Sequence, residues 1–176
     1  GYGKYPDDIV MDGMVHLSAV RSKYPRARVL KIDASKAEAL PGVLGVLTAK
    51  DVPNNKVGHI QQDWDVMIAE GNITRMIGDT ICVVVETEEI LEKAKKLVKV
   101  DYEKLEPIRN VHEAMAEDAP QIHSSGNLCQ QRHVTRGDAK TALEKAAYKV
   151  TRSFTTPFTE HAFLEPECAV SFPYKD

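Results

Sequence analysis

The sequence predicts a fold of short β-strands and short α-helices, and three observations support this. First, 43% of the 176 residues are hydrophobic and 28% are charged, which suits one ordinary globular domain or one domain plus part of a second. Second, runs of strand length such as 28–34 and 81–86 are rich in aliphatic residues. Third, the apolar residues of 90–98 recur at helical spacing.

The first elements alternate between strand and turn. Strands are predicted at residues 13–22, 28–34 and 43–48. In the second strand, Leu30 and Ile32 alternate with charged residues, the period of two expected of a half-buried strand. A brief helix should precede the third strand, because Ser35 and Glu38 have the spacing of a capping box. A turn or single helical turn is expected at 49–55.

Residues 54–75 show only weak periodicity. They predict a surface excursion that points Trp64, Val66, Met67 and Ile68 inward. Loops of this length are uncommon unless they have a function or contact a partner. The excursion is therefore a candidate contact surface.

The middle of the chain predicts a strand, a helix and a second strand. The run "ICVVVE" (81–86) is continuous and apolar, as for a strand covered on both faces. Thr87 is expected to cap the following helix, with Glu88 and Glu89 in its first turn. Residues 98–103 return to strand, so the unit predicts a right-handed crossover.

The last third of the chain is more polar. A glycine-punctuated linker is expected at 121–138, with Asp138 capping the helix after it. The predicted elements are helices at 111–120 and 139–148 and strands at 148–157 and 169–172. In the first of these strands, Tyr148, Val150 and Phe154 should share one face.

Composition argues against several classes of protein. A net charge of −3 without clustered Lys and Arg argues against a nucleic-acid footprint, and no run approaches the roughly 20 apolar residues that span a membrane. Cys82, Cys129 and Cys168 form no CxxC pair, so free thiols in a reducing cytoplasm are expected, with Cys82 inert in its apolar strand. Phosphate-binding loops and nucleophile motifs are missing, and the start at Gly1 suggests a piece of a longer chain.

One short run, "TEHAFLEPECAV", gathers reactive side chains. If residues 158–165 were helical, His161 and Glu165 would lie four apart on one face and could share a zinc or iron ion. Glu160 or Cys168 could add a third ligand. This arrangement is the metal-site hypothesis.

A structural role for the same run is the favoured interpretation. Pro157 and Pro166 bracket the segment, and Phe158, Phe163 and Leu164 call for burial. A buried His or Glu is usually satisfied by hydrogen bonds within the protein. The side chains are therefore expected to position the chain and not to bind a metal.

Several separated stretches resemble one family. They are "GKYPDDI…GMVHLSAVRS…ARVLKID" (3–33), "ALPGVLGVLTAKDVP" (39–53), "IGDTICVVVET" (77–87), "VKVDYEKLEP" (98–107), "GNL" (126–128) and "EHAFLEPECAV" (160–170). In this order they resemble the start of the molybdenum-binding subunit of the xanthine dehydrogenase and aldehyde oxidase family. The patterns "LPGV…VLTA.DVP" and "FLEPE" are the most specific.

The resemblance implies an α+β fold with a hammerhead-type mixed sheet and flanking helices. It implies a hammerhead domain over 1–118, a linker over 119–137 and the start of a second α+β domain, which binds molybdopterin, over 138–176. It also implies a hydroxylation at a carbon of an aldehyde or of a heterocycle such as a purine. Electrons would pass to 2Fe-2S clusters and FAD on partner subunits or domains.

The family's catalytic glutamate lies in a glycine-rich motif that this sequence does not contain. No catalytic, cofactor-binding or metal-binding residue is therefore expected here, and the chain alone should hold no cofactor and be inactive. His161, Glu165 and Pro166 are expected to be positioning residues at the root of the second domain. Two alternatives are a non-catalytic binding or assembly module that uses 54–75 and 88–97, and a small metallohydrolase that uses His161 and Glu165.

Overall fold

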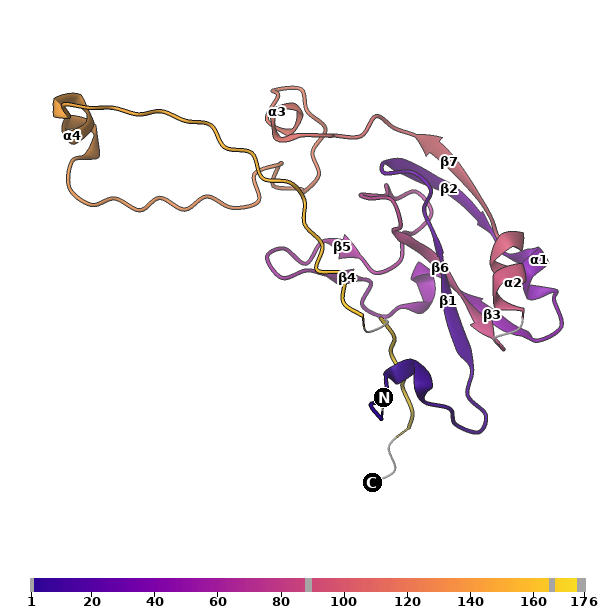
Figure 1. Ribbon diagram of the computed structural model, residues 1–176. Helices are drawn as coiled ribbons and strands as arrows, with labels where there is room; N and C mark the ends of the chain where they lie inside the picture. The colour runs from indigo at the N-terminus through magenta and orange to yellow at the C-terminus, as the bar shows by residue number, and fades with distance from the viewer. Residues whose placement is uncertain (1, 88–89, 165–166, 174–176) are drawn as a thin grey trace. The chain divides into compact units, whose positions relative to one another are not determined.

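The computed structural model describes residues 2–87, 90–164 and 167–173 (Figure 1). Residues 15–130 form one compact unit. The residues before 15 and after 130 are grouped in a second unit.

Sheet A lies at the centre of the first unit and has three antiparallel strands. Its middle strand is β6 (Thr80–Glu86), which pairs with β1 (His16–Arg21) on one side and β3 (Val43–Leu47) on the other. The aliphatic run makes β6 the most buried strand, and Ile81 and Val84 are completely buried. The predicted apolar strand forms, but its cover on both faces is only partial, because Val83 and Val85 are half-buried.

Two short helices pack against sheet A. They are α1 (Ser35–Glu38) and α2 (Leu91–Leu97), which contact each other and lie side by side in Figure 1. Each helix buries one small residue completely, Ala37 in α1 and Ala94 in α2. Lys93 and Lys96 of α2 stay exposed, as the helical spacing predicted.

Sheet B contains two antiparallel strands, β2 (Ala27–Asp33) and β7 (Lys99–Lys104). The pairing shifts between Val29 and Lys31, which is a β-bulge. The bulge turns Leu30 outward, where it is 53% exposed, while Val29 is fully buried. The predicted alternation that placed Leu30 inside is therefore wrong at this residue.

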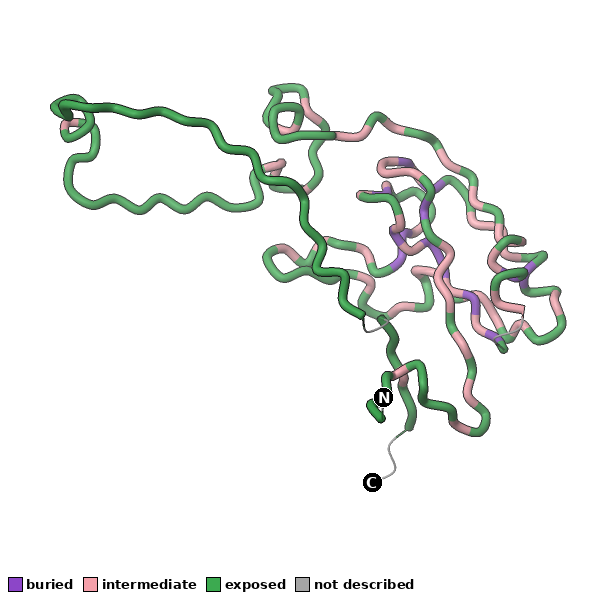
Figure 2. The backbone as a smooth tube through the Cα atoms, viewed as in Figure 1, coloured by how far each residue is buried: buried purple, intermediate pink, exposed green. Residues whose placement is uncertain are grey.

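The hydrophobic core joins both sheets to the 54–75 excursion. Its buried members are Val29, Ile68 and Ile81, and Ile32, Val100 and Tyr102 pack against them. Figure 2 shows that the buried positions fall within the strands, helices and loops of residues 15–130. This core is the reason why the three segments hold a fixed arrangement.

The predicted crossover is wrong, although its strand, helix and strand all form. β6 belongs to sheet A and β7 to sheet B, and both pair antiparallel with their neighbours. A third small sheet, of β4 (Lys56–Val57) and β5 (Trp64–Asp65), is also antiparallel. The α+β class holds, but the described residues form three small antiparallel sheets in place of the mixed sheet, because β2 offers β7 an antiparallel partner that periodicity cannot reveal.

The predicted capping box is absent from α1. Ala34 occupies the N-cap and makes no side-chain cap. The Asp33 carboxylate takes the place of a cap: its Oδ1 accepts hydrogen bonds from the backbone N–H of Ser35 (3.1 Å) and from the Ser35 hydroxyl (2.6 Å). These bonds lower the pKa of Asp33, because they favour its charged form.

The start of α2 also differs from the prediction. The helix begins at Leu91, and its N-cap position is held by Ile90 and not by Thr87. Glu88 and Glu89 lie outside the described residues. Two further short elements of this unit agree broadly with the sequence: a 3₁₀ turn η2 (Ala49–Asp51), and α3 (Val111–Ala114), which ends earlier than expected.

The second unit contains a 3₁₀ turn η1 (Pro6–Asp8) and one helix, α4 (Ala139–Lys145), among the residues that the structure describes. Asp138 caps α4 as predicted, and its carboxylate accepts a hydrogen bond from the backbone N–H of Thr141 at 3.1 Å. The strands predicted at 148–157 and 169–172 do not form, because neither stretch pairs with another described segment.

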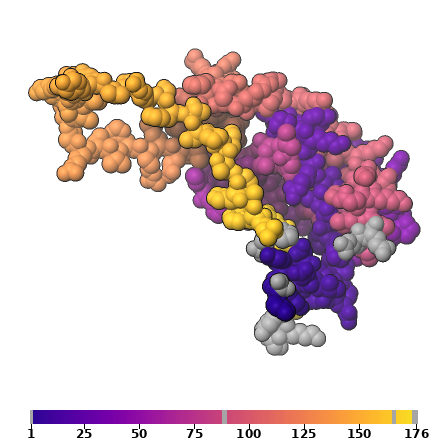
Figure 3. All heavy atoms as spheres, in the orientation of Figure 1, coloured from indigo at the N-terminus to yellow at the C-terminus, as the bar shows by residue number. Residues whose placement is uncertain are grey.

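The aromatic residues of the second unit are exposed. Tyr148, Phe154 and Phe158 each show most or all of their surface. In Figure 3, the residues before and after α4 (orange) form narrow rows of atoms with little packed against them. Within the described residues, no helix has the length and apolar character required to cross a membrane.

Candidate functional site: a polar network on the 54–75 excursion

The base of the excursion is closed by one asparagine. The Asn55 side-chain amide donates to the Met67 carbonyl at 2.8 Å, and the Met67 N–H donates to the Asn55 side-chain oxygen at 2.9 Å. This pair fixes the hairpin of β4 and β5, and the chain then turns inward. Met67 and Ile68 are buried, as the sequence predicted.

Trp64 and Val66 are not tucked inward, which corrects that part of the prediction. They are 39% and 38% exposed. Extended backbone sends alternate side chains to opposite sides, so burial of Met67 leaves Val66 and Trp64 facing out. The Arg75 guanidinium lies 5.6 Å from the Trp64 ring centroid, a cation–π distance that suits an exposed ring.

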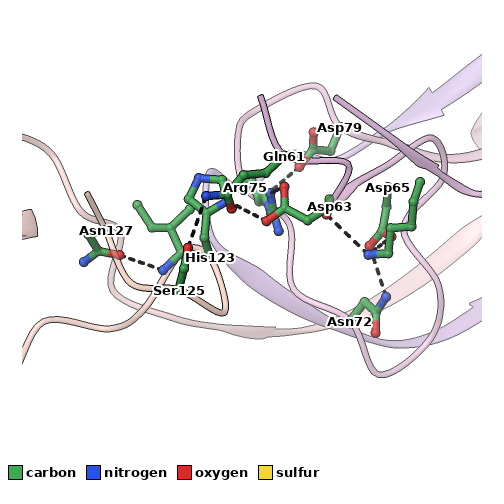
Figure 4. A network of polar contacts seen from close by, with 11 residues as sticks. Gln61, Asp63, Asp65, Asn72, Arg75, Asp79, His123, Ser125 and Asn127 are labelled. Carbon is green, nitrogen blue, oxygen red and sulfur yellow. Dashed lines mark hydrogen bonds and ion pairs between the residues drawn. The ribbon is translucent and has the colours of Figure 1, made fainter. Parts of the chain in front are cut away.

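Asp63 is the centre of the polar network on this excursion (Figure 4). One carboxylate oxygen accepts from Arg75 Nη1 at 3.3 Å. The other lies 2.5 Å from His123 Nδ1. The His123 bond, and then the Arg75 bond, hold the pKa of Asp63 below its ordinary value, so the carboxylate stays charged near neutral pH.

A second carboxylate, Asp79, shapes the turn that carries Arg75. It is buried, and its Oδ2 accepts the backbone N–H groups of Arg75 at 2.6 Å and Met76 at 3.1 Å. Asp65 of β5 has a largely buried side chain, which pairs with Lys56 and accepts from the Asn72 amide at 3.1 Å. These bonds position the cations of the network.

Residues 121–127 form the other side of the network. Gln61 donates to the Ser125 hydroxyl at 3.1 Å, which adds a second link beside His123 and Asp63. Asn127 holds the segment in shape, because its amide donates to two backbone carbonyls and its oxygen accepts the Ile122 N–H at 2.7 Å. Part of the predicted linker is thus fastened to the excursion.

The network has a structural role, because it links the 54–75 excursion to residues 121–127. Asp63 uses one oxygen on the Arg75 guanidinium and the other on the His123 ring, and His123 commits Nδ1 to it. Among the residues that the structure describes, no three His, Cys, Asp or Glu side chains gather as metal ligands would. Sequence reasoning missed the pair, because 60 positions separate Asp63 from His123 and no local pattern links them.

The run "TEHAFLEPECAV" (159–170) is mostly exposed and has no helix or strand in its described residues. Residues 158–164 form no helix, and His161 is exposed with its ring stacked on Phe163 at 5.5 Å. The backbone N–H of His161 donates to the Glu160 carboxylate at 2.9 Å. The helical spacing that the metal-site hypothesis needs is therefore absent from 158–164, while Glu165 and Pro166 lie outside the described residues.

The burial predicted for Phe158, Phe163 and Leu164 is also wrong. All three are strongly exposed. Cys168, the possible third ligand, is exposed too. The structure therefore does not bring the reactive side chains of this run into one site within the part of the chain that it describes.

Two ionisable groups in β6 are buried. Cys82 is fully buried, and burial raises the pKa of its thiol to about 11, which supports the prediction of an inert core thiol. Glu86 is also fully buried, and neither carboxylate oxygen has a hydrogen-bond partner among the described residues. Burial raises the pKa of Glu86 above its ordinary value, because the charged form is poorly solvated there.

Comparisons with known proteins agree on one family. A family model described as "Aldehyde oxidase and xanthine dehydrogenase, a/b hammerhead domain" matches residues 1–106. A protein of Bacillus subtilis described as a probable subunit of xanthine dehydrogenase is 32% identical, covering 98% of this chain and 23% of the relative. The nicotinate dehydrogenase large molybdopterin subunit of Eubacterium barkeri is also 32% identical, covering 98% of this chain and 40% of the relative.

Solved structures show the same likeness. CO dehydrogenase from Oligotropha carboxidovorans superposes with a TM-score of 0.64 at 34% identity, covering 70% of this chain and 16% of that one. Aldehyde oxidoreductase from Desulfovibrio gigas gives a TM-score of 0.60 at 31% identity, covering 69% and 15%. The chain therefore spans 23% and 40% of these two relatives and about one sixth of these solved chains.

Proposed function

The chain belongs to the aldehyde oxidase and xanthine dehydrogenase family, and from this premise we propose that it is the hammerhead-containing part of a molybdenum hydroxylase subunit. The observation that carries the proposal is the coverage: two relatives match 98% of this chain, which is only 23% and 40% of their own length. The complete subunit would hydroxylate a carbon of an aldehyde or of a heterocycle such as a purine. The catalytic residues would lie in polypeptide outside these 176 residues.

The division of labour within the chain is part of the proposal. Residues 1–118 would form the hammerhead platform, 119–137 the linker, and 138–176 the first elements of the molybdopterin-binding domain. The exposed aromatic residues after Tyr148 support this division, because large apolar side chains normally require cover. His161, Glu165 and Pro166 would position the second domain, and the ring stacking of His161 on Phe163 fits a structural part.

The described residues do not fit a molybdenum cofactor site. The Cys82 thiol is enclosed in the core, and its raised pKa disfavours the thiolate that a metal requires. His161 is exposed, and no three ligand-type side chains gather among the described residues. We therefore derive no step through the cofactor, and we propose that molybdopterin is held by the remainder of the subunit.

The proposed partners follow from the same premise. Electrons would leave the molybdenum subunit through 2Fe-2S clusters to FAD on partner subunits or domains. Cys129 and Cys168 are free and exposed, and Cys82 is free and buried, which agrees with a reducing cytoplasm as the place of action.

The proposal is tested by comparing the complete subunit with the 176-residue chain. Both are purified from cells that make the iron–sulfur and flavin partners, and metal content and dye reduction with purines and aldehydes are measured. We expect bound molybdenum and activity in the complete subunit and neither in the 176 residues. Oxidation of a purine or aldehyde by the 176-residue chain alone would overturn the placement of the active site.

A non-catalytic binding or assembly module is the second candidate. The observation in its favour is the outward-facing pair Trp64 and Val66 on an excursion that the polar network holds in place. A module of this kind predicts that the 176-residue chain by itself co-elutes with partner proteins in gel filtration, and that Trp64→Ala in this chain abolishes the co-elution. Retention of all partners by that variant would remove this candidate.

A further inference from the structure

A cleft of about 410 Å³ opens beside the polar network, within residues 15–130. It is bounded by the start of β2, by residues 71–75, by the hairpin of β4 and β5, and by residues 107–108 and 121–122. Its volume falls in the range of pockets that hold small ligands or a single anchoring side chain. The proposed function does not use it.

Four cations line this cleft: Arg26, Arg28, Lys56 and Arg75. Three of them have carboxylate partners, which are Glu103 for Arg28, Asp65 for Lys56 and Asp63 for Arg75. Four cations against three carboxylates leave one net positive charge at the cleft. A singly charged anion matches that balance better than a multiply charged phosphate does.

The unbalanced charge belongs to Arg26. Its Nη1 donates to the backbone carbonyl of Glu106 at 3.0 Å, and no carboxylate lies within ion-pair distance of it among the described residues. Arg26 is half-buried as a residue, and the hydrogen bond of its guanidinium to Glu106 is exposed. A guanidinium held by one neutral carbonyl has further N–H donors for a planar oxyanion.

Arg28 stands two residues along the chain, in β2, and adds to this donor set. Its Nε bonds Glu103 at 3.1 Å and its Nη1 bonds the Gly71 carbonyl at 2.9 Å, which fixes the guanidinium in place. The Nη2 group takes no part in these bonds, and Arg28 lines the cleft together with Arg26. Two anchored guanidinium groups are pre-organised for a carboxylate.

The cleft also has apolar wall surfaces. They are formed by Pro25, Ile73, Pro107, Ile108 and Ile122. An inorganic anion would leave these surfaces without a partner, whereas an organic acid would cover them. The combination favours an anion that has an apolar body.

We propose that this cleft binds a carboxylate carried on an apolar group, with Arg26 as its main ionic partner and Arg28 beside it. A small organic acid and an acidic side chain flanked by aliphatic residues share this chemistry. The proposal rests on the cleft alone and does not depend on the proposed function.

The test is a titration of the ¹⁵N-labelled 176-residue chain, followed by amide chemical shifts. One arm adds sodium benzoate, and the other adds the capped tripeptide acetyl-leucyl-glutamyl-leucinamide. We expect saturable shifts at Ile73, Ile108 and Ile122 in at least one arm. The arm that saturates at the lower concentration identifies the source of the carboxylate.

The variant Arg26→Gln should weaken that binding about tenfold or more, because a charge-assisted hydrogen bond is lost. Arg21→Gln is the matched control: Arg21 also donates to one backbone carbonyl, that of Gly78 at 2.9 Å, but lies outside the cleft lining. We expect the control to bind as the parent does. If Arg26→Gln loses the dispersed spectrum of a folded chain, Arg26→Lys tests the same point, since it keeps the charge and removes the planar fork.

Three results would overturn the proposal. They are the lack of saturable shifts in both arms, saturable shifts at residues away from the cleft, and equal weakening by Arg26→Gln and Arg21→Gln. Sodium sulfate at matched ionic strength serves as a further check. If sulfate displaced benzoate completely, charge alone would explain the binding and the role given to the apolar walls would be wrong.

Discussion

Residues 15–130 and residues 131–173 contain similar kinds of amino acids but use them differently. In the first region, Val29, Ile68 and Ile81 meet in a core from three separate segments. In the second region, Phe154 and Phe158 are as apolar but stand exposed. The comparison shows that apolar residues form a core only where a second apolar surface meets them, and local sequence does not state where that surface is.

The largest expected effect is on the core. Ile81→Ala should lower the free energy of unfolding by about 2–5 kcal/mol, because it leaves a cavity beside Val29 and Ile68. Phe158→Ala removes a larger side chain, yet it should change that free energy by less than about 0.5 kcal/mol, since the ring is exposed. Urea unfolding followed by circular dichroism measures both. Equal losses would erase the distinction between the two regions.

Glu86 makes the first region less stable than its packing allows. Its pKa is raised above 4.5 in the fold, so the folded protein binds more protons than the unfolded chain and loses stability as pH rises from 4.5 through the raised pKa. Glu86→Gln should therefore raise the urea midpoint at pH 7, with a gain that shrinks as pH falls from the raised pKa towards 4.5 and is lost below 4.5. Glu38→Gln, at an exposed residue of α1, is the control and should lack this gain. A gain that persisted unchanged at pH 3.5 would contradict the account.

Asp63 has the opposite pH dependence. Its pKa is lowered below 3.8, so its carboxylate stabilises the fold above that pH, and the contribution is lost as pH falls through the lowered pKa. Asp63→Asn should loosen residues 121–127 at pH 7, with faster hydrogen exchange at Ile122 and Gly126 than in the parent. The effect on global unfolding should be smaller than that of Ile81→Ala, because the network is partly exposed. Asp101→Asn, an exposed change on β7, should leave this exchange as it is in the parent.

The smallest effect is expected at α4. Asp138→Ala removes the cap of a seven-residue helix, and so short a helix is marginal without packing. We expect the helical NMR shifts of residues 139–145 to disappear while the urea midpoint of the first region is unchanged. A fall in that midpoint would show that α4 supports the core.

Local sequence predicted the elements of the first region well. The strands β1, β2, β3, β6 and β7 all appear close to where periodicity placed them, and in the second region capping chemistry correctly placed Asp138 before α4. The exposure of Leu30 could not be predicted, because a bulge depends on the register of the partner strand. The placement of β7 in sheet B could not be predicted for the same reason, because strand pairing depends on residues far apart in the sequence.

The candidate site was less predictable than the fold. His161 attracted attention through its neighbours in sequence, whereas the contact that organises the network joins Asp63 to His123 across 60 positions. The aromatic residues near Phe158 were expected to be buried, but hydrophobicity states a need for cover and not its source. The family was predicted from the resemblance of separate motifs and not from hydrophobic periodicity.

The three cysteines should react with an alkylating reagent at different rates, because one is buried and two are exposed. Cys82 sits inside β6 and can meet a maleimide only when sheet A separates, so its rate of alkylation reports how often the centre opens. Cys168 in the second region is already exposed and should be consumed at once, as should Cys129 at the end of the first. Mass spectrometry at timed intervals would thus compare the alkylation of Cys82 with that of the exposed cysteines in the same sample. The difference in rate measures how often the core opens.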